Sequence, residues 1–149
     1  MKKNWILLLP ILILIVAGSL LIKYAPVPYT SLVKPSFAPP AILFGIAWTI
    51  FYTIFYFTST KVIHGSIKKN PLFQLYFLIL GFHFIWILFF FTFRFYLISL
   101  FTLIVIYLLS VAYVFRMSKF SKKDALLNIP YLLWLLFALL LNLSILILN

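Results

Sequence analysis

The fold is decided by the stretch Lys34-Pro-Ser-Phe-Ala-Pro-Pro40 and the apolar run that follows it, Ala41-Ile-Leu-Phe-Gly-Ile-Ala-Trp48-Thr-Ile-Phe-Tyr52. The two prolines that end the first stretch cannot donate backbone N–H groups, which suits the first turn of a helix, where these donors have no partner. The helix that they open places Gly45, Trp48 and Tyr52 on one face. A glycine beside a large aromatic side chain on one face predicts a recess with an indole wall.

The composition is that of a membrane protein. Of 149 residues, 66% are hydrophobic, whereas the apolar share of a soluble globular domain is roughly half. Five apolar runs are long enough to cross a hydrocarbon core of about 30 Å. We therefore expect an all-α fold, a single five-helix transmembrane bundle over residues 1–149, with helices near 5–23, 40–60, 72–92, 95–115 and 124–147.

Charge and residue types exclude several classes of function. The chain has twelve Lys and Arg residues and a single acidic residue, Asp124. The basic residues lie between apolar runs, so we expect them to contact lipid headgroups rather than nucleic acid. The chain has no cysteine, which excludes disulfides and thiolate metal sites. A lone carboxylate excludes paired acid–base catalysis, and no glycine-rich phosphate loop is present.

Residues 24–39 form the one long connection. Their proline density predicts an irregular but stiff loop between the first two helices, which we expect to cap a ligand cavity. The first apolar run also has the pattern of a signal peptide, but it continues to Ile22, so we expect it to remain as the first helix. His64, among lysines in the next loop, is expected to be solvated.

Three stretches carry a family signature. In the first, residues 29–52, the matching residues are Tyr29, Leu32, Lys34, Pro35, Ser36, Pro39, Pro40, Phe44, Trp48, Thr49 and Tyr52. Residues of the last apolar run match it at Pro130, Tyr131, Trp134, Phe137, Ala138 and Asn142. The chain thus closely resembles the translocator protein family, also called tryptophan-rich sensory proteins or peripheral benzodiazepine receptor-like proteins. Trp86 matches in the third run, but His83 stands at a family Asn, Ile87 at a Ser and Phe37 at a Trp.

The resemblance implies a receptor for porphyrins such as protoporphyrin IX and haem, acting in tetrapyrrole or stress regulation or in transport. It also implies a homodimer, with the tetrapyrrole as ligand and no required cofactor. The indole N–H donors of Trp48 and Trp134, on different helices, suit a planar aromatic ligand. Lys34 is a candidate partner for porphyrin carboxylates. The ligand-binding residues that we expect are Tyr29, Pro40, Trp48, Tyr52, His83, Trp86, Tyr131, Trp134, Ala138 and Asn142.

Alternatives remain open. Some bacterial relatives degrade protoporphyrin IX in light, and Trp48 and Trp134 match the tryptophans implicated there, so an enzyme is the second hypothesis. A sterol-binding protein is disfavoured. The sterol motif of animal relatives needs a Val or Leu, a Tyr and then a Lys or Arg on the last helix, and no basic residue follows Lys123. His83 is either a neutral imidazole bonded to a neighbouring helix or a ligand contact, including an axial ligand to haem iron. Tyr29 alternatively belongs to an interfacial aromatic belt.

The distribution of positive charge predicts an orientation. One side of the expected bundle carries nine basic residues: Lys2, Lys3, Lys61, Lys68, Lys69, Arg116, Lys119, Lys122 and Lys123. The other side carries three: Lys23, Lys34 and Arg94. The positive-inside rule then places the amino end inside and the 24–39 loop and carboxyl end outside. We expect a multi-pass protein of the bacterial cytoplasmic membrane.

Overall fold

The fold is taken from a computed structural model, which describes residues 2–62 and 70–149. The described residues form six α-helices: α1 (Lys2–Lys23), α2 (Ala41–Val62), α3 (Pro71–Ile87), α4 (Tyr96–Ser118), α5 (Lys122–Leu127) and α6 (Ile129–Leu148). No strand occurs in the described ranges. The expected environment of His64 lies outside the described residues.

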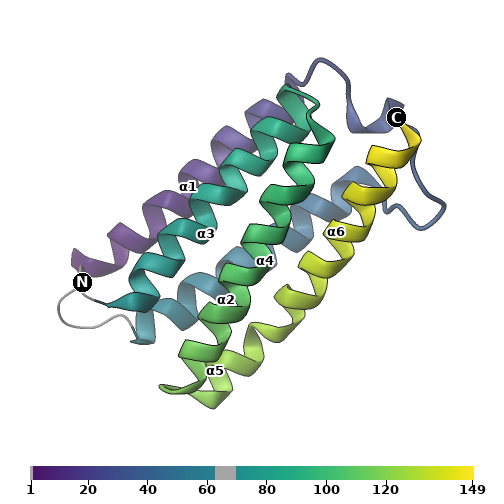
Figure 1. The fold of residues 1–149 in the computed structure, drawn as a ribbon. Helices are drawn as coiled ribbons and strands as arrows, with labels where there is room; N and C mark the ends of the chain where they lie inside the picture. The colour runs from purple at the N-terminus through teal and green to yellow at the C-terminus, as the bar shows by residue number, and fades with distance from the viewer. Residues whose placement is uncertain (1, 63–69) are drawn as a thin grey trace.

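The helices form five segments long and apolar enough to cross a membrane, because α5 and α6 together make the fifth. In Figure 1, α1, α3, α4 and α6 lie side by side, with α2 behind them. The main packing partners follow the same order, α1 on α3, α3 on α4 and α4 on α6. The carboxyl end lies near the connection between α1 and α2, at the opposite end of the bundle from the amino end. The all-α, five-span fold expected from the sequence is confirmed.

The third segment ends in a π-helical turn, Leu88–Thr92. In this turn the backbone hydrogen bond spans five residues, from the Phe93 N–H to the Leu88 carbonyl at 3.0 Å. Arg94 then adopts a left-handed φ of 60°, and α4 begins two residues later. The reversal is as short as the sequence predicts for an antiparallel hairpin. The π turn, which the sequence pattern did not indicate, widens the helix beside the bundle interior.

The last segment is interrupted, whereas one helix over 124–147 was expected with Pro130 inside it. The structure ends α5 at Leu127 and begins α6 at Ile129. Pro130 therefore occupies the first turn of α6, where its missing N–H costs nothing. Ser121 caps α5 by accepting a bond from the Asp124 N–H at 3.2 Å, as its spacing from Asp124 indicates.

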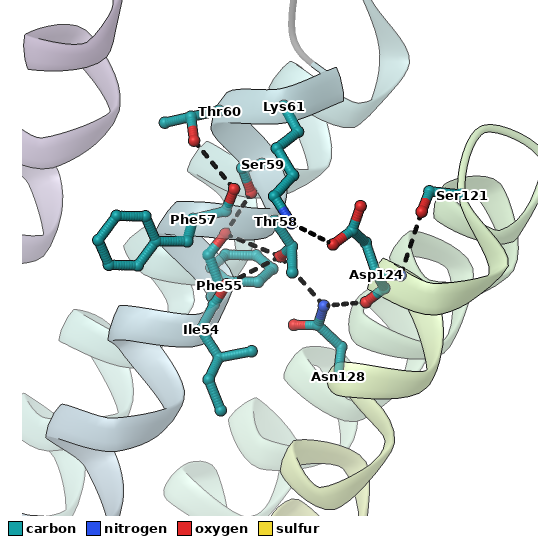
Figure 2. A network of polar contacts seen from close by, with 10 residues as sticks. All are labelled: Ile54, Phe55, Phe57, Thr58, Ser59, Thr60, Lys61, Ser121, Asp124 and Asn128. Carbon is teal, nitrogen blue, oxygen red and sulfur yellow. Dashed lines mark hydrogen bonds and ion pairs between the residues drawn. The ribbon is translucent and has the colours of Figure 1, made fainter.

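A polar network joins α2 to α5 (Figure 2). It lies at the end of the bundle away from the connection between α1 and α2 (Figure 1). The Lys61 Nζ lies 2.8 Å from an Asp124 carboxylate oxygen. The Asn128 amide donates to the Thr58 hydroxyl at 3.1 Å and to the Asp124 carbonyl at 2.8 Å. We call Thr58, Lys61, Asp124 and Asn128 the α2–α5 network. It uses the one carboxylate side chain of the protein.

The connection between α1 and α2 is held by its own polar groups. The Lys34 ammonium donates to the carbonyls of Tyr29, Thr30 and Leu32, at 3.1, 3.0 and 2.9 Å. Its Nζ also lies 5.1 Å from the centre of the Tyr29 ring. At the far side of the loop, the Asn149 side chain exchanges two bonds with the Val33 backbone. The loop is thus an ordered element rather than a tether.

Candidate functional site

A cavity of about 370 Å³ opens within the half of the bundle next to the long loop. Its walls come from the second half of α1, the first half of α2, the π-helical end of the third segment, and α6. Tyr29 of the loop also lines it. Most of the lining atoms are apolar, and the volume falls within the range of small-molecule sites, about 300–1,000 Å³.

The wall formed by α2 has the recess predicted from the sequence. A Cβ atom built on Gly45 would meet no other atom within 4 Å, so the glycine borders open space. The Trp48 indole and the Tyr52 phenol stack 5.6 Å apart at an angle of 23°. Together these side chains present a flat aromatic surface beside an unfilled position.

The cavity brings together six of the ten residues expected to bind ligand: Tyr29, Trp48, Tyr52, Trp86, Ala138 and Asn142. The other four do not line it. Pro40 is exposed at the end of the loop. The rings of His83, Tyr131 and Trp134 lie behind Trp48, at centroid distances of 5.0, 6.5 and 6.2 Å.

The two indoles expected to act as a pair differ in their surroundings. The Trp134 Nε1–H is fully enclosed and has no hydrogen-bond partner in the described part of the chain. The Trp48 indole lines the cavity, and its N–H is not among the enclosed polar atoms of the described residues. Trp48 is therefore a wall of the cavity, and Trp134 supports that wall from behind.

His83 is fully buried, and its hydrogen bond differs from the one expected. Its Nδ1–H donates to the Ile79 carbonyl of its own helix at 2.9 Å, whereas a bond to a neighbouring helix was expected. Since the carbonyl only accepts, Nε2 carries the lone pair, and it has no partner among the described residues. Trp48 and Tyr52 lie edge-on to the imidazole, at 5.0 and 5.6 Å.

Asn142 links three helices at the wall of the cavity. Its side-chain oxygen accepts bonds from the Trp86 Nε1–H at 3.1 Å and from the Ser99 hydroxyl at 2.9 Å. Its amide donates to the Tyr96 carbonyl at 3.0 Å. The Asn142 oxygen thus fixes the orientation of the Trp86 ring. The bond from Ser99 joins α4 to α6.

Tyr29 connects the loop to the cavity. Its ring is buried and packs edge-on against Phe44 at 5.3 Å, and its hydroxyl donates to the Pro39 carbonyl at 3.4 Å. Burial raises the pKa of this phenol above its ordinary value, so it remains a neutral donor at physiological pH. The loop therefore contributes a buried tyrosine to the cavity wall.

Two parts of the wall were missed in the sequence. The second half of α1 lines the cavity through residues such as Leu14, Gly18 and Lys23, and the π turn contributes Phe90 and Phe91. A Cβ on Gly18 would lie 3.0 Å from the Ile87 side chain, so this glycine permits the close approach of α1 to α3. Its small size was the available signal, but a small residue near the end of a signal-like segment has an equally simple explanation.

Comparison with known proteins gives consistent results. The model of the TspO/MBR family matches residues 6–148. A tryptophan-rich protein TspO of Archaeoglobus fulgidus is 33% identical over 128 residues, covering 81% of this chain and 79% of the relative. A tryptophan-rich protein TspO of Chlorobaculum tepidum is 35% identical over 124 residues, covering 81% and 78%.

Proposed function

The chain belongs to the TspO/MBR family, and from this premise we propose that it is an integral membrane receptor for a flat, hydrophobic ligand of the porphyrin type. Protoporphyrin IX and haem are the ligands, and tetrapyrrole sensing, stress regulation or transport is the role. The observation that carries the proposal is the cavity beside Gly45, walled by the stacked rings of Trp48 and Tyr52.

The character of the cavity supports this class of ligand. Its walls are mainly apolar, and two of its hydroxyl groups are already used by their own helices: Ser19 donates to the Ile15 carbonyl and Thr49 to the Gly45 carbonyl. Few donors therefore remain for a ligand. A site of this kind favours a planar apolar body with few polar edges over a sugar, nucleotide or peptide.

Titration of the purified protein in lipid nanodiscs with protoporphyrin IX, followed by tryptophan quenching in the dark, tests the proposal. We expect saturable binding that Trp48→Phe weakens, because Phe keeps the ring but lacks the donor and part of the surface. Trp5→Phe is the matched control, since Trp5 is exposed on the first helix. Absence of saturable binding by the unaltered protein would overturn the proposal.

The second candidate function is light-dependent degradation of protoporphyrin IX, and the position of the indoles favours it over other chemistry. Trp48 borders the cavity, and the Trp134 ring lies 6.2 Å behind it. Excited porphyrin would supply the reactive species, and the protein would position the ring near oxidisable indoles. Illumination in the presence of oxygen should then bleach the bound porphyrin. Bleaching that is equally fast with Trp48→Phe and Trp134→Phe would exclude this function.

A further inference from the structure

One charged side chain stands on the wall of the cavity. Lys23, the last residue of α1, lines the end of the cavity where the long loop begins. Its side chain is exposed, and its Nζ lies 5.3 Å from the centre of the Tyr24 ring. Among the described residues it forms no ion pair, because the one salt bridge there joins Lys61 and Asp124 at the other end of the bundle.

The other basic residues near the loop are not available to a ligand in the cavity. Each of the three Lys34 N–H donors has a backbone carbonyl as partner, so Lys34 stabilises the loop and has none left to donate. Arg94 lies in the turn between α3 and α4 and borders a separate shallow depression beside Phe93 and Phe95. Pairing of Lys34 with a porphyrin carboxylate, as the sequence suggested, is therefore disfavoured.

We propose that Lys23 binds a carboxylate of the cavity ligand and thereby selects ligands that carry an acidic group beside a flat apolar body. This inference rests on the proposed function. A ligand held in this way has its acid at the end of α1, at headgroup depth, and its rings against Trp48 and Tyr52. Such a ligand keeps its charge out of the apolar part of the cavity, where burial would be costly.

A role without ligand recognition also predicts a lysine here. A cation in the last turn of a helix interacts favourably with its free carbonyls, and lysines anchor helix ends in headgroups. Neither of these two roles depends on whether the ligand carries an acidic group. A comparison of two ligands that differ only in their acidic groups therefore separates them from the proposal.

The experiment compares protoporphyrin IX with its dimethyl ester in nanodiscs of neutral phosphatidylcholine, which removes attraction to anionic lipid. For the unaltered protein we expect the acid to bind about five- to tenfold more tightly than the ester, as a partly exposed ion pair allows. Lys23→Gln should lose this preference by weakening the acid alone, and Lys23→Arg should keep most of it. Arg94→Gln, a charge removed at the same end of the bundle, should behave as the unaltered protein.

Each outcome decides the matter. An unchanged ratio of acid to ester affinity in Lys23→Gln, or equal weakening of both ligands, would overturn the role of Lys23 while leaving the receptor proposal intact. The ester serves as the control for folding, because it needs the cavity but not the charge. Failure of the unaltered protein to bind either ligand would instead overturn the receptor proposal, and this inference with it.

Discussion

Gly45 matters because nothing fills the space beside it. A Cβ there would meet no atom within 4 Å, and the same is true of Gly81 on α3, which does not line the cavity. The two positions therefore differ in location but not in the room available to a larger side chain. This makes them a matched pair for testing whether the cavity holds the ligand.

We expect Gly45→Leu to fill part of the cavity and to weaken protoporphyrin IX binding at least about tenfold, since the added side chain and the ligand compete for one space. Gly81→Leu should leave the affinity unchanged. The measurement is the quenching titration together with thermal unfolding in detergent, in which both variants should be as stable as the parent or slightly more so. Equal affinities of the two variants would place the ligand elsewhere.

Asn142 gives a second prediction at this scale. Asn142→Ala removes the acceptor of the Trp86 N–H and leaves this buried donor without a partner, whereas the Ser99 hydroxyl can still donate to the Tyr96 carbonyl. We expect a loss of about 2–3 kcal/mol in the free energy of unfolding, read as a lower Tm. Ser144→Ala is the control, because Ser144 bonds only to its own helix. A normal Tm for Asn142→Ala would show that these bonds contribute little.

At this scale the sequence predicted which residues matter better than it predicted how they are used. The recess at Gly45 followed from helical spacing, which is local. Two features depend on how neighbouring helices pack, which no spacing along one helix determines. One is that His83 bonds to Ile79 of its own helix rather than to another helix, and the other is the enclosure of the Trp134 N–H. Whether the unpartnered His83 Nε2 and Trp134 Nε1–H contact a ligand stays a prediction.

At the scale of the element, the positions of the helices were largely predictable, and their irregularities were not. A run of apolar residues ended by prolines or basic residues sets helix bounds within a few residues. The break at Asn128 lies just before Pro130, which has no N–H for the preceding helical turn and is its local signal. The bond from the Asn128 side chain to Thr58 on α2, a tertiary contact, has no such local signal. The π turn at Leu88–Thr92 likewise has no local signal in a run of phenylalanines.

The α2–α5 network makes the third prediction. Lys61→Met leaves the buried Asp124 carboxylate without its ammonium partner. We expect a loss of up to about 1 kcal/mol in the free energy of unfolding, because Lys61 is more than half exposed and solvent screens the pair. Lys122→Met, at an exposed position on α5, is the matched control. Thermal unfolding in detergent compares them. Equal Tm values would mean that water replaces the ammonium without cost.

At the scale of the whole molecule, five spans and a single bundle follow from hydropathy, because lipid requires every backbone polar group to be satisfied within a helix. The cavity does not follow from hydropathy. It exists where α1, α2 and α6 meet the π-helical end of the third segment, and its shape depends on side chains from four separate segments. Sequence alone identified one of these walls with its recess, and the resemblance supplied others.

The fourth prediction concerns orientation, which the positive-inside rule assigns with the amino end inside. The chain has no cysteine, so single cysteines can be introduced without background. We expect Ser36→Cys, in the long loop, to react with a membrane-impermeant maleimide added to intact cells. Lys119→Cys, after α4, should react only after permeabilisation. The reverse pattern would invert the assignment.

Lys34 has a further consequence, because its nitrogen is bound on all three sides by carbonyls of the loop. An amine held in this way is a poor nucleophile, so among the ten lysines and the amino terminus it should be acylated slowly by an amine-reactive reagent. Opening of the loop would release it. The acylation rate of Lys34, followed by mass spectrometry with and without ligand, would thus measure how often the loop between α1 and α2 opens.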